Sequence, residues 1–248
     1  MKTPPPNIEL TAQFRVDLEH PPVLADDLTC AFMLQQHLSQ YSPKLVEWYL
    51  GGNSQEDALR YSAFDENGPT KAIEAVLTAQ FRKQKNIFPM RGFGLWNGED
   101  STSGASLNLF IQETQRPSDV RFETDISDFL NYQCVLNTML KMVDIWQPLF
   151  ASAAPAFYGE KAVFKDRPGV GWMLYLPKVL TAQQVPEARA LVPVMGKNEK
   201  GQDQQIGTII VSVTDEPFSS ENAEHVKTAN AIEIRLVDQD LLPRYADL

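Results

Sequence analysis

Three side chains with the chemistry of a metal site lie close together near the C-terminus. The stretch FSSENAEHVKTAN, residues 218–230, places Glu221, Glu224 and His225 within five positions. This spacing is close to the H-x-x-E-H pattern of some zinc peptidases, although Glu221 stands where the first histidine of that pattern should be. A zinc site needs about three protein ligands and a base, and the two other histidines of the chain have no recognisable ligand spacing. We therefore predict no metal, and keep a metal-dependent hydrolase that uses this segment as the alternative hypothesis.

The same segment also has the features of an ordinary helix over about residues 219–241. Ser219 is a good N-cap, and Glu221 would lie in the first turn, where the positive end of the helix dipole favours acids. At 100° per residue, Glu221 and His225 share a face that we expect to point to solvent. The opposite, core-facing side is expected to carry Ala223, Val226, Asn230, Ile234, Val237 and Leu241.

Other catalytic patterns are incomplete. The GFG at 92–94 lacks the third glycine and the preceding strand of a dinucleotide site, so it is predicted to be a loop turn. Asp119, Glu123 and Asp125 alternate as the carboxylates of a nuclease do, but the companion lysine is missing, and we interpret them as an exposed strand face. We predict no catalytic residues, no cofactor and no enzymatic activity.

Composition and charge narrow the class of partner. The chain has 22 Lys and Arg against 32 Asp and Glu, which gives a net charge of −10, and its pI is about 4.8. The electric field of a protein with this negative charge repels a phosphate backbone and attracts a basic protein, although moderate acidity is also common for solubility alone. Nucleic acid is therefore not expected as a ligand.

The N-terminus and the cysteines indicate a compartment. MKTPPPNIEL has prolines where a signal peptide needs an apolar run, and nowhere do about 18 apolar residues follow one another. Cys30 and Cys134 lie in apolar helical patterns and are expected to be packed, reduced thiols. We therefore expect a cytoplasmic protein with no membrane association.

Hydrophobic periodicity predicts an α+β fold. Residues 8–18 alternate as a strand with one wet face, and 105–112 and 120–126 are expected to form an antiparallel pair. The remaining expected elements are helices at 23–41, 67–86 and 127–150 with a Ser127 cap, a short helix or turn at 42–59, two strands within 157–178, a short helix at 182–189, and a strand at 207–213. Loops are expected at 90–104 and 196–201.

These elements do not alternate as in a parallel α/β sheet, so we predict an antiparallel or mixed sheet packed with several helices. The apolar stretch 147–157 divides the chain loosely but is too apolar for a free linker. We expect residues 1–248 to form a single domain.

Several short motifs resemble one family. They are GWMLYLPKVL, VPEARALVPV, GTIIVSV and HVKTANAIEIRLVDQDLLP in the C-terminal half, and LVEWYLGG, ALRYSAFDENGPTKA and GFGLW in the N-terminal half. Together they extend over about residues 8–245 and resemble the immunity protein 52 family of bacterial polymorphic toxin systems.

The resemblance implies a non-enzymatic antitoxin. Such a protein binds a cognate toxin effector with a restriction-endonuclease-like nuclease domain, delivered by contact-dependent or type VI secretion, and silences it in the cytoplasm. No interface residue carries over by motif. The toxin-binding residues that we predict are acidic residues of expected loops, with aromatic residues as further candidates: Glu66, Glu99, Asp100, Asp215 and Glu216, and Trp48, Tyr49 and Trp96. The sequence leaves open the oligomeric state, and whether inhibition plugs the toxin's site, distorts it or blocks toxin assembly.

Overall fold

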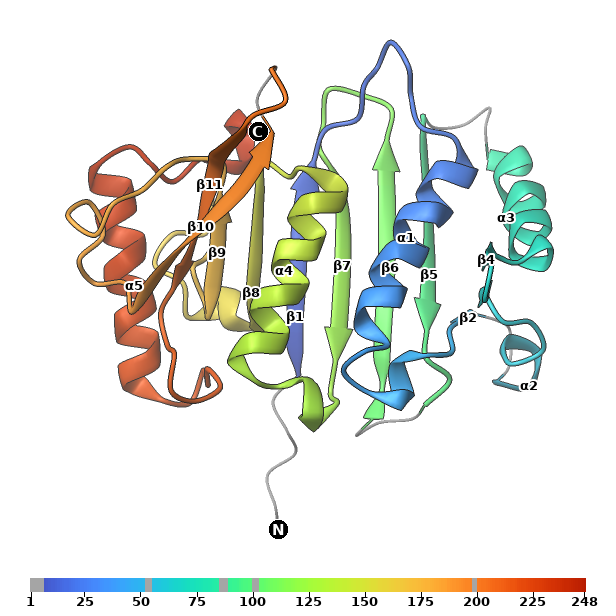
Figure 1. Ribbon diagram of the computed structural model, residues 1–248, viewed down its shortest axis with the longest axis horizontal. Coiled ribbons are helices and arrows are strands. Elements are labelled where there is room, and N and C mark those ends of the chain that lie inside the picture. Colours follow the sequence, from blue (N-terminus) through green and yellow to red (C-terminus); the bar gives the residue numbers. More distant parts are fainter. Residues whose placement is uncertain (1–6, 52–54, 85–88, 100–102, 198–199) are drawn as a thin grey trace.

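A nine-stranded antiparallel sheet forms the centre of the computed structural model, which describes residues 7–51, 55–84, 89–99, 103–197 and 200–248 (Figure 1). Across the sheet the strands are β10 (Ala190–Lys197), β11 (Asp203–Val211), β9 (Met173–Leu176), β8 (Phe150–Pro155), β1 (Ile8–Phe14), β7 (Ser118–Thr124), β6 (Ala105–Gln112), β5 (Met90–Trp96) and β2 (Tyr49–Leu50). The N-terminal strand β1 therefore lies in the middle of the sheet, between β8 and β7.

The helices complete an α+β fold, as predicted. They are α1 (Leu24–Leu38), α2 (Gln55–Ala58), α3 (Lys71–Gln84), α4 (Tyr132–Trp146) and α5 (Ala223–Asp238), and a separate small hairpin joins β3 (Phe64–Asp65) to β4 (Gly68–Pro69). None of the helices in the described part of the chain is both long enough and apolar enough to cross a membrane.

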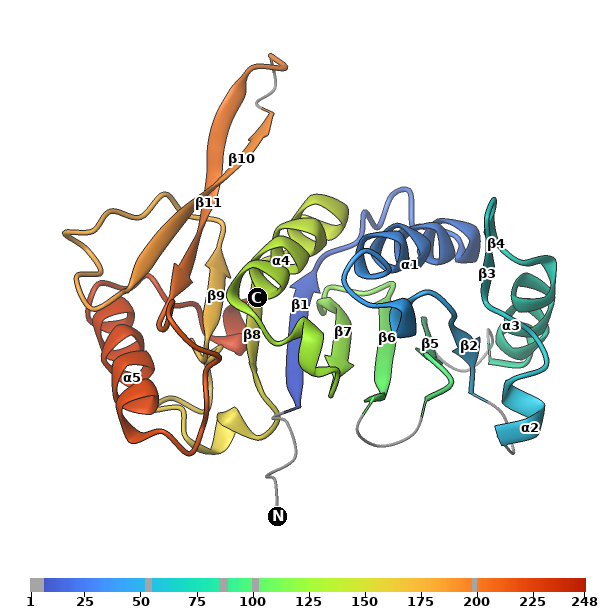
Figure 2. The ribbon, with the colours of Figure 1, turned by 60° about the horizontal axis from the view of Figure 1, so that its bottom comes forward.

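The helices cover the two faces of the sheet unequally. Figure 2 shows α1 and α4 above the sheet, where α4 contacts β1 and β8 and α1 contacts α4 and β6. Helix α5 lies on the opposite face, near β9 and β11. No described helix lies below β1, β7, β6 and β5, so this part of the sheet has one covered face and one open face (Figure 2).

The burial of side chains follows this layering. In β1 and β7 every second side chain is buried beneath α1 and α4, and the intervening side chains are more exposed. Trp48 is fully buried here, donates its indole N–H to the Leu45 carbonyl at 2.9 Å, and lies 6.3 Å from the ring of Phe122. Trp48 is therefore a core anchor and not a surface contact.

Several predicted elements are confirmed, some of them with shifted ends. The strand at 105–112 has the predicted bounds and pairs antiparallel with β7. The long helix α4 is also confirmed, but its N-cap is Asn131, whose side chain accepts from the Cys134 N–H at 3.0 Å. Ser127 instead begins a separate 3-10 turn, Ser127–Phe129, which ends before α4 starts at Tyr132.

Three of the longer strands lie where the sequence suggested none, as do the two-residue strands β2, β3 and β4. The GFG segment lies inside β5, because its glycines leave room for neighbouring side chains of β6 in place of forming a turn. The stretch at 147–157, interpreted as a loose division, contains β8, and the region before 207 contains the edge strand β10. Conversely, 157–178 holds only β9 and 182–189 forms turns instead of a helix.

Helix α5 buries a different face from the one expected. Its buried side chains include His225, Ala229, Ile232 and Leu236, whereas Ile234 is 45% exposed. The helix carries apolar residues on two stripes, and the sequence period does not tell which of them packs against the sheet. The N-cap is Asn222, whose side chain accepts from the Glu224 N–H at 3.0 Å.

Candidate functional site

In the segment that contains Glu221, Glu224 and His225, a side chain of α5 holds the loop that precedes this helix. His225 is buried, which corrects the expectation that it points to solvent, and its Nδ1 accepts from the Ser219 N–H at 3.1 Å. Its Nε2 therefore carries the proton and donates to Glu216 Oε1 at 2.9 Å. Glu221 and Glu224 are exposed, and no group of three or more His, Cys, Asp or Glu among the described residues could hold a metal ion. The arrangement fixes the turn before α5.

The predicted toxin-binding residues fall into two separate groups. Glu66 lies in the β3–β4 turn, Trp96 ends β5 and Glu99 follows it, whereas Asp215 and Glu216 lie between β11 and α5. Five strands separate β5 from β11 in the sheet. Asp100 lies outside the described residues. These residues do not form one continuous patch, and their role stays a prediction.

The open face of the sheet gathers a different set of polar side chains. Here we define it as the outward side chains of β1, β7, β6 and β5, on the side away from α1 and α4 (Figure 2). The set comprises Glu9, Thr11 and Gln13 of β1, Asp119, Arg121 and Glu123 of β7, Ser106, Asn108, Phe110 and Gln112 of β6, and Met90, Gly92, Gly94 and Trp96 of β5. Alternation in residues 8–18 signalled this wet face, but not which strands would extend it.

Like charges meet on the β1–β7 side of the open face, near one end of these two strands. Glu9 of β1 lies directly opposite Glu123 of β7 in the antiparallel register. Arg121 reaches them only loosely, with its guanidinium 3.6 Å from Glu9 and 3.9 Å from Glu123. Burial raises the pKa of Glu123, the Glu9 carboxylate raises it further, and burial likewise raises the pKa of Asp119. The carboxylates are therefore incompletely neutralised within the protein.

The β5–β6 side of the open face is flat and partly aromatic. A Cβ atom at Gly92 would lie 2.8 Å from the ring of Phe110, and one at Gly94 would lie 2.6 Å from the Asn108 side chain. Side chains of β6 therefore occupy the space above both glycines. Trp96 follows on the same face, and its indole Nε1 has no hydrogen-bond acceptor among the described residues. A shallow aromatic area thus adjoins the acidic one.

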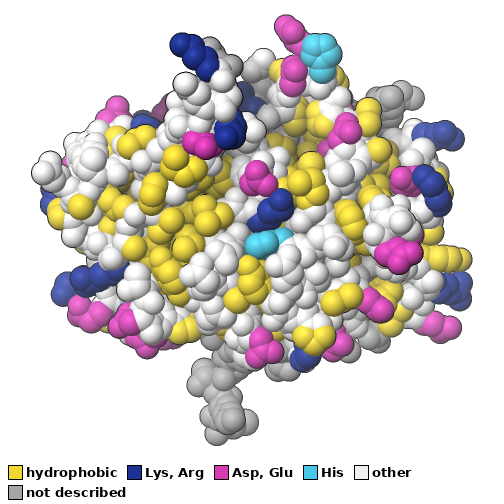
Figure 3. Space-filling model, in the orientation of Figure 1, with side chains coloured by type: hydrophobic (Ala, Val, Ile, Leu, Met, Phe, Trp, Pro, Cys, Tyr) yellow, Lys and Arg dark blue, Asp and Glu magenta, His cyan; other side chains and the backbone are white. Residues whose placement is uncertain are grey.

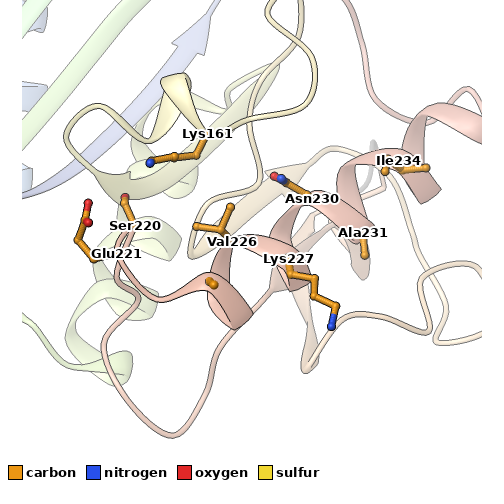
Figure 4. A pocket seen from close by; sticks show the side chains of 9 residues that line it. Lys161, Ser220, Glu221, Val226, Lys227, Asn230, Ala231 and Ile234 are labelled. Carbon is orange, nitrogen blue, oxygen red and sulfur yellow. The ribbon is translucent and has the colours of Figure 1, made fainter.

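A second concave surface runs along the outer side of α5. It is an open groove of about 640 Å³, lined by Lys161, Ser220, Glu221, Ala223, Val226, Lys227, Asn230, Ala231 and Ile234. Figure 4 shows the Lys161 amino group pointing toward Glu221, while Lys227 extends away from the groove. Two lysines and one glutamate give this groove a charge opposite in sign to that of the open face.

The helix-covered face differs again. Figure 3 shows apolar side chains gathered on its left half, beside α4, with charged side chains scattered around them. The edge strand β10 also has apolar side chains: Leu191 and Val192 are partly buried, and Met195 is 59% exposed. The acidic side chains on this face are scattered and form no single patch in this view.

Comparison with known proteins identifies relatives of the chain. The family model described as immunity protein 52 matches residues 27–244. Among solved structures, a chain described as Pseudomonas aeruginosa T6SS protein PA0821 is similar, with a TM-score of 0.51 and 12% identity over 92% of this chain and 74% of that chain. At this identity the likeness concerns the fold alone. No curated protein matches the chain.

Proposed function

This chain belongs to the immunity protein 52 family, and from this premise we propose that it binds and neutralises a nuclease-type toxin effector in the cytoplasm. As an immunity protein it has a cognate toxin as its partner. We further propose that the toxin is delivered by type VI secretion or a related contact-dependent route, and that this chain inhibits it by binding alone, without catalysing a reaction.

The net charge of −10 is the observation that supports a nuclease target. A nuclease must hold a phosphate backbone and therefore presents a cationic surface to its substrate. An acidic protein competes for that surface, and complementary fields speed association, which matters when the target is lethal. The open sheet face carries three of these acidic side chains, Glu9, Asp119 and Glu123, against one cation, Arg121.

The contacts of the Glu221, Glu224 and His225 segment favour binding over hydrolysis. Both ring nitrogens of His225 are used in holding Ser219 and Glu216, so neither is left for a metal. Glu224 lies 3.4 Å from Lys227 in an exposed ion pair. We also propose that residues 1–248 act as one domain, because strands from both halves of the chain pair in a single sheet.

The test is co-expression of this protein with the toxin domain encoded by the neighbouring gene. We expect growth rescue, a complex that survives purification, and loss of nuclease activity in the purified complex. A toxin of another class, such as a membrane-active one, would contradict the nuclease target. Rescue without any complex would contradict inhibition by binding.

A further inference from the structure

We propose that the open sheet face is the surface on which the toxin docks, with Glu9, Asp119 and Glu123 meeting cationic side chains of the toxin and Trp96 and Phe110 making the apolar contact. This inference rests on the proposed function and deepens it, because it assigns the docking surface. The occupant is the DNA-binding surface of a nuclease, a partner defined by its positive charge.

The first support is that this part of the sheet has no cover. Helices α1 and α4 pack on its other face, and α5 covers only the region near β9 and β11 (Figure 2). The outward side chains of β1 are each partly exposed, whereas the inward ones are buried. Four adjacent strands thus present an uncovered sheet surface, which suits a protein partner better than a small molecule.

The second support is a like-charge pair that the fold does not need. Directly opposite like charges destabilise an antiparallel pair, yet Glu9 faces Glu123 in the register of β1 and β7. Asp119 adds a third carboxylate on the same face, and Arg121 is the one cation among the outward side chains defined above. An arrangement that costs stability is expected at a functional site, where a partner supplies the missing charge.

The raised pKa values agree with this geometry. Burial raises the pKa of Asp119 and Glu123, and the neighbouring Glu9 carboxylate adds to the effect at Glu123. A lysine or arginine of the toxin placed beside Glu9 and Glu123 would favour their charged forms and remove the repulsion between them. The free protein therefore leaves room for an added cation beside Glu9 and Glu123, on the β1–β7 side of this face.

The third support is the aromatic area beside the carboxylates. The absence of side chains at Gly92 and Gly94 lets those of Phe110 and Asn108 lie over them, and Trp96 adds a partly exposed indole whose N–H is buried without an acceptor in the part of the chain that the structure describes. Interfaces that bind tightly combine buried aromatic anchors with surrounding charge that steers the encounter. The open face offers both on adjacent strands.

The groove on α5 is the competing surface. Its apolar side chains, Val226 and Ile234, would suit a partner helix, but its rim carries Lys161 and Lys227 against Glu221. That charge does not complement a cationic toxin. The variant Ile234→Asp disrupts this groove, and it should weaken toxin binding only if the toxin docks on the groove and not on the open face.

The experiment measures affinity for a catalytically inactive form of the toxin domain encoded by the neighbouring gene. The test variant is Asp119→Asn with Glu123→Gln, and its matched control is Asp128→Asn with Asp144→Asn, two exposed acids beside and on α4. Each pair of substitutions changes the formal net charge from −10 to −8, so only the location of the lost charge differs. Calorimetry at low and at physiological ionic strength gives the affinity and its salt dependence.

We expect the test variant to bind about tenfold to a hundredfold more weakly than the wild type, with a smaller salt dependence, and the control to bind as the wild type does. Thermal unfolding should show the test variant to be as stable as the wild type or more so, since the like-charge repulsion is gone. Tight wild-type binding that the test variant retains, or that Ile234→Asp alone removes, would overturn the docking surface and leave the proposed function standing. No binding by the wild type would overturn both.

Discussion

Glu233 fastens the segment between β8 and β9 to helix α5, and its removal gives the sharpest test of the structure. The residue is 1% exposed, and its Oε1 accepts from the Tyr158 hydroxyl at 2.8 Å and from the Val170 N–H at 2.9 Å. Its Oε2 accepts from the Val163 N–H at 2.8 Å. One carboxylate thus satisfies three donors that are distributed over the segment between β8 and β9.

We predict that Glu233→Ala lowers the free energy of unfolding by about 3 to 5 kcal/mol. Hydrogen bonds to a charged group contribute about 1.5 to 3 kcal/mol each, so three amount to about 4.5 to 9 kcal/mol before desolvation. The cost of burying the carboxylate offsets part of this sum, in agreement with the raised pKa of Glu233, for which burial is the main cause. In a chain of this size, each kcal/mol lowers Tm by about 2 to 4 °C.

Urea and thermal unfolding followed by circular dichroism measure the change. The matched control is Glu224→Ala on the same helix, whose side chain is 78% exposed and whose loss should cost less than about 0.5 kcal/mol. A loss below about 1 kcal/mol for Glu233→Ala, with the control unchanged, would refute the three-bond clamp.

The variant Glu233→Gln adds a pH test. Because the pKa of Glu233 is raised in the folded protein, the folded state takes up a proton at a higher pH than the unfolded chain does. The wild type should therefore gain stability relative to Glu233→Gln as the pH falls from neutral through the raised pKa toward about 4.3, the ordinary value for glutamate. A difference that stays constant over this range would show that the carboxyl has no raised pKa.

Three further predictions test other parts of the structure. Arg91→Ala should cost about 3 to 5 kcal/mol in unfolding measurements, because Asp27, 4% exposed, loses the cation 2.5 Å away, and adding Asp27→Asn should restore part of the loss. His225→Ala should keep its toxin-neutralising activity in the growth assay, whereas a metal-dependent hydrolase would lose activity. Gly207→Ala should lower stability by about 1 to 3 kcal/mol in urea, since its Cβ would lie 2.4 Å from the Tyr175 ring.

The sequence predicted best those strands and helices that have one buried and one solvent-exposed face. The strand at 105–112 alternates cleanly and has the predicted bounds, and α4 has a single broad apolar band whose core position is confirmed. The segment at 90–96 was missed because two glycines in a strand look like a turn until a neighbouring strand fills the space above them. In α5 two apolar stripes compete, and only packing selects one.

The residues of the candidate site were predicted less well than the secondary structure. Trp96 was singled out from the sequence and lies on the open face, whereas the predicted acidic loop residues that the structure describes fall into two separate groups. Glu9 gave no functional signal, because its partner across the strands, Glu123, is far away in the chain.

The sequence by itself determined the acidic charge, the α+β composition and the family resemblance, because these depend on residue types and on local periodicity. Only the tertiary structure decided which strands are neighbours, which face of them stays open and which carboxylates meet there. The physical reason is that a period of two assigns a side chain to one face of its own strand, whereas the pairing of strands is set by long-range contacts that no local pattern encodes.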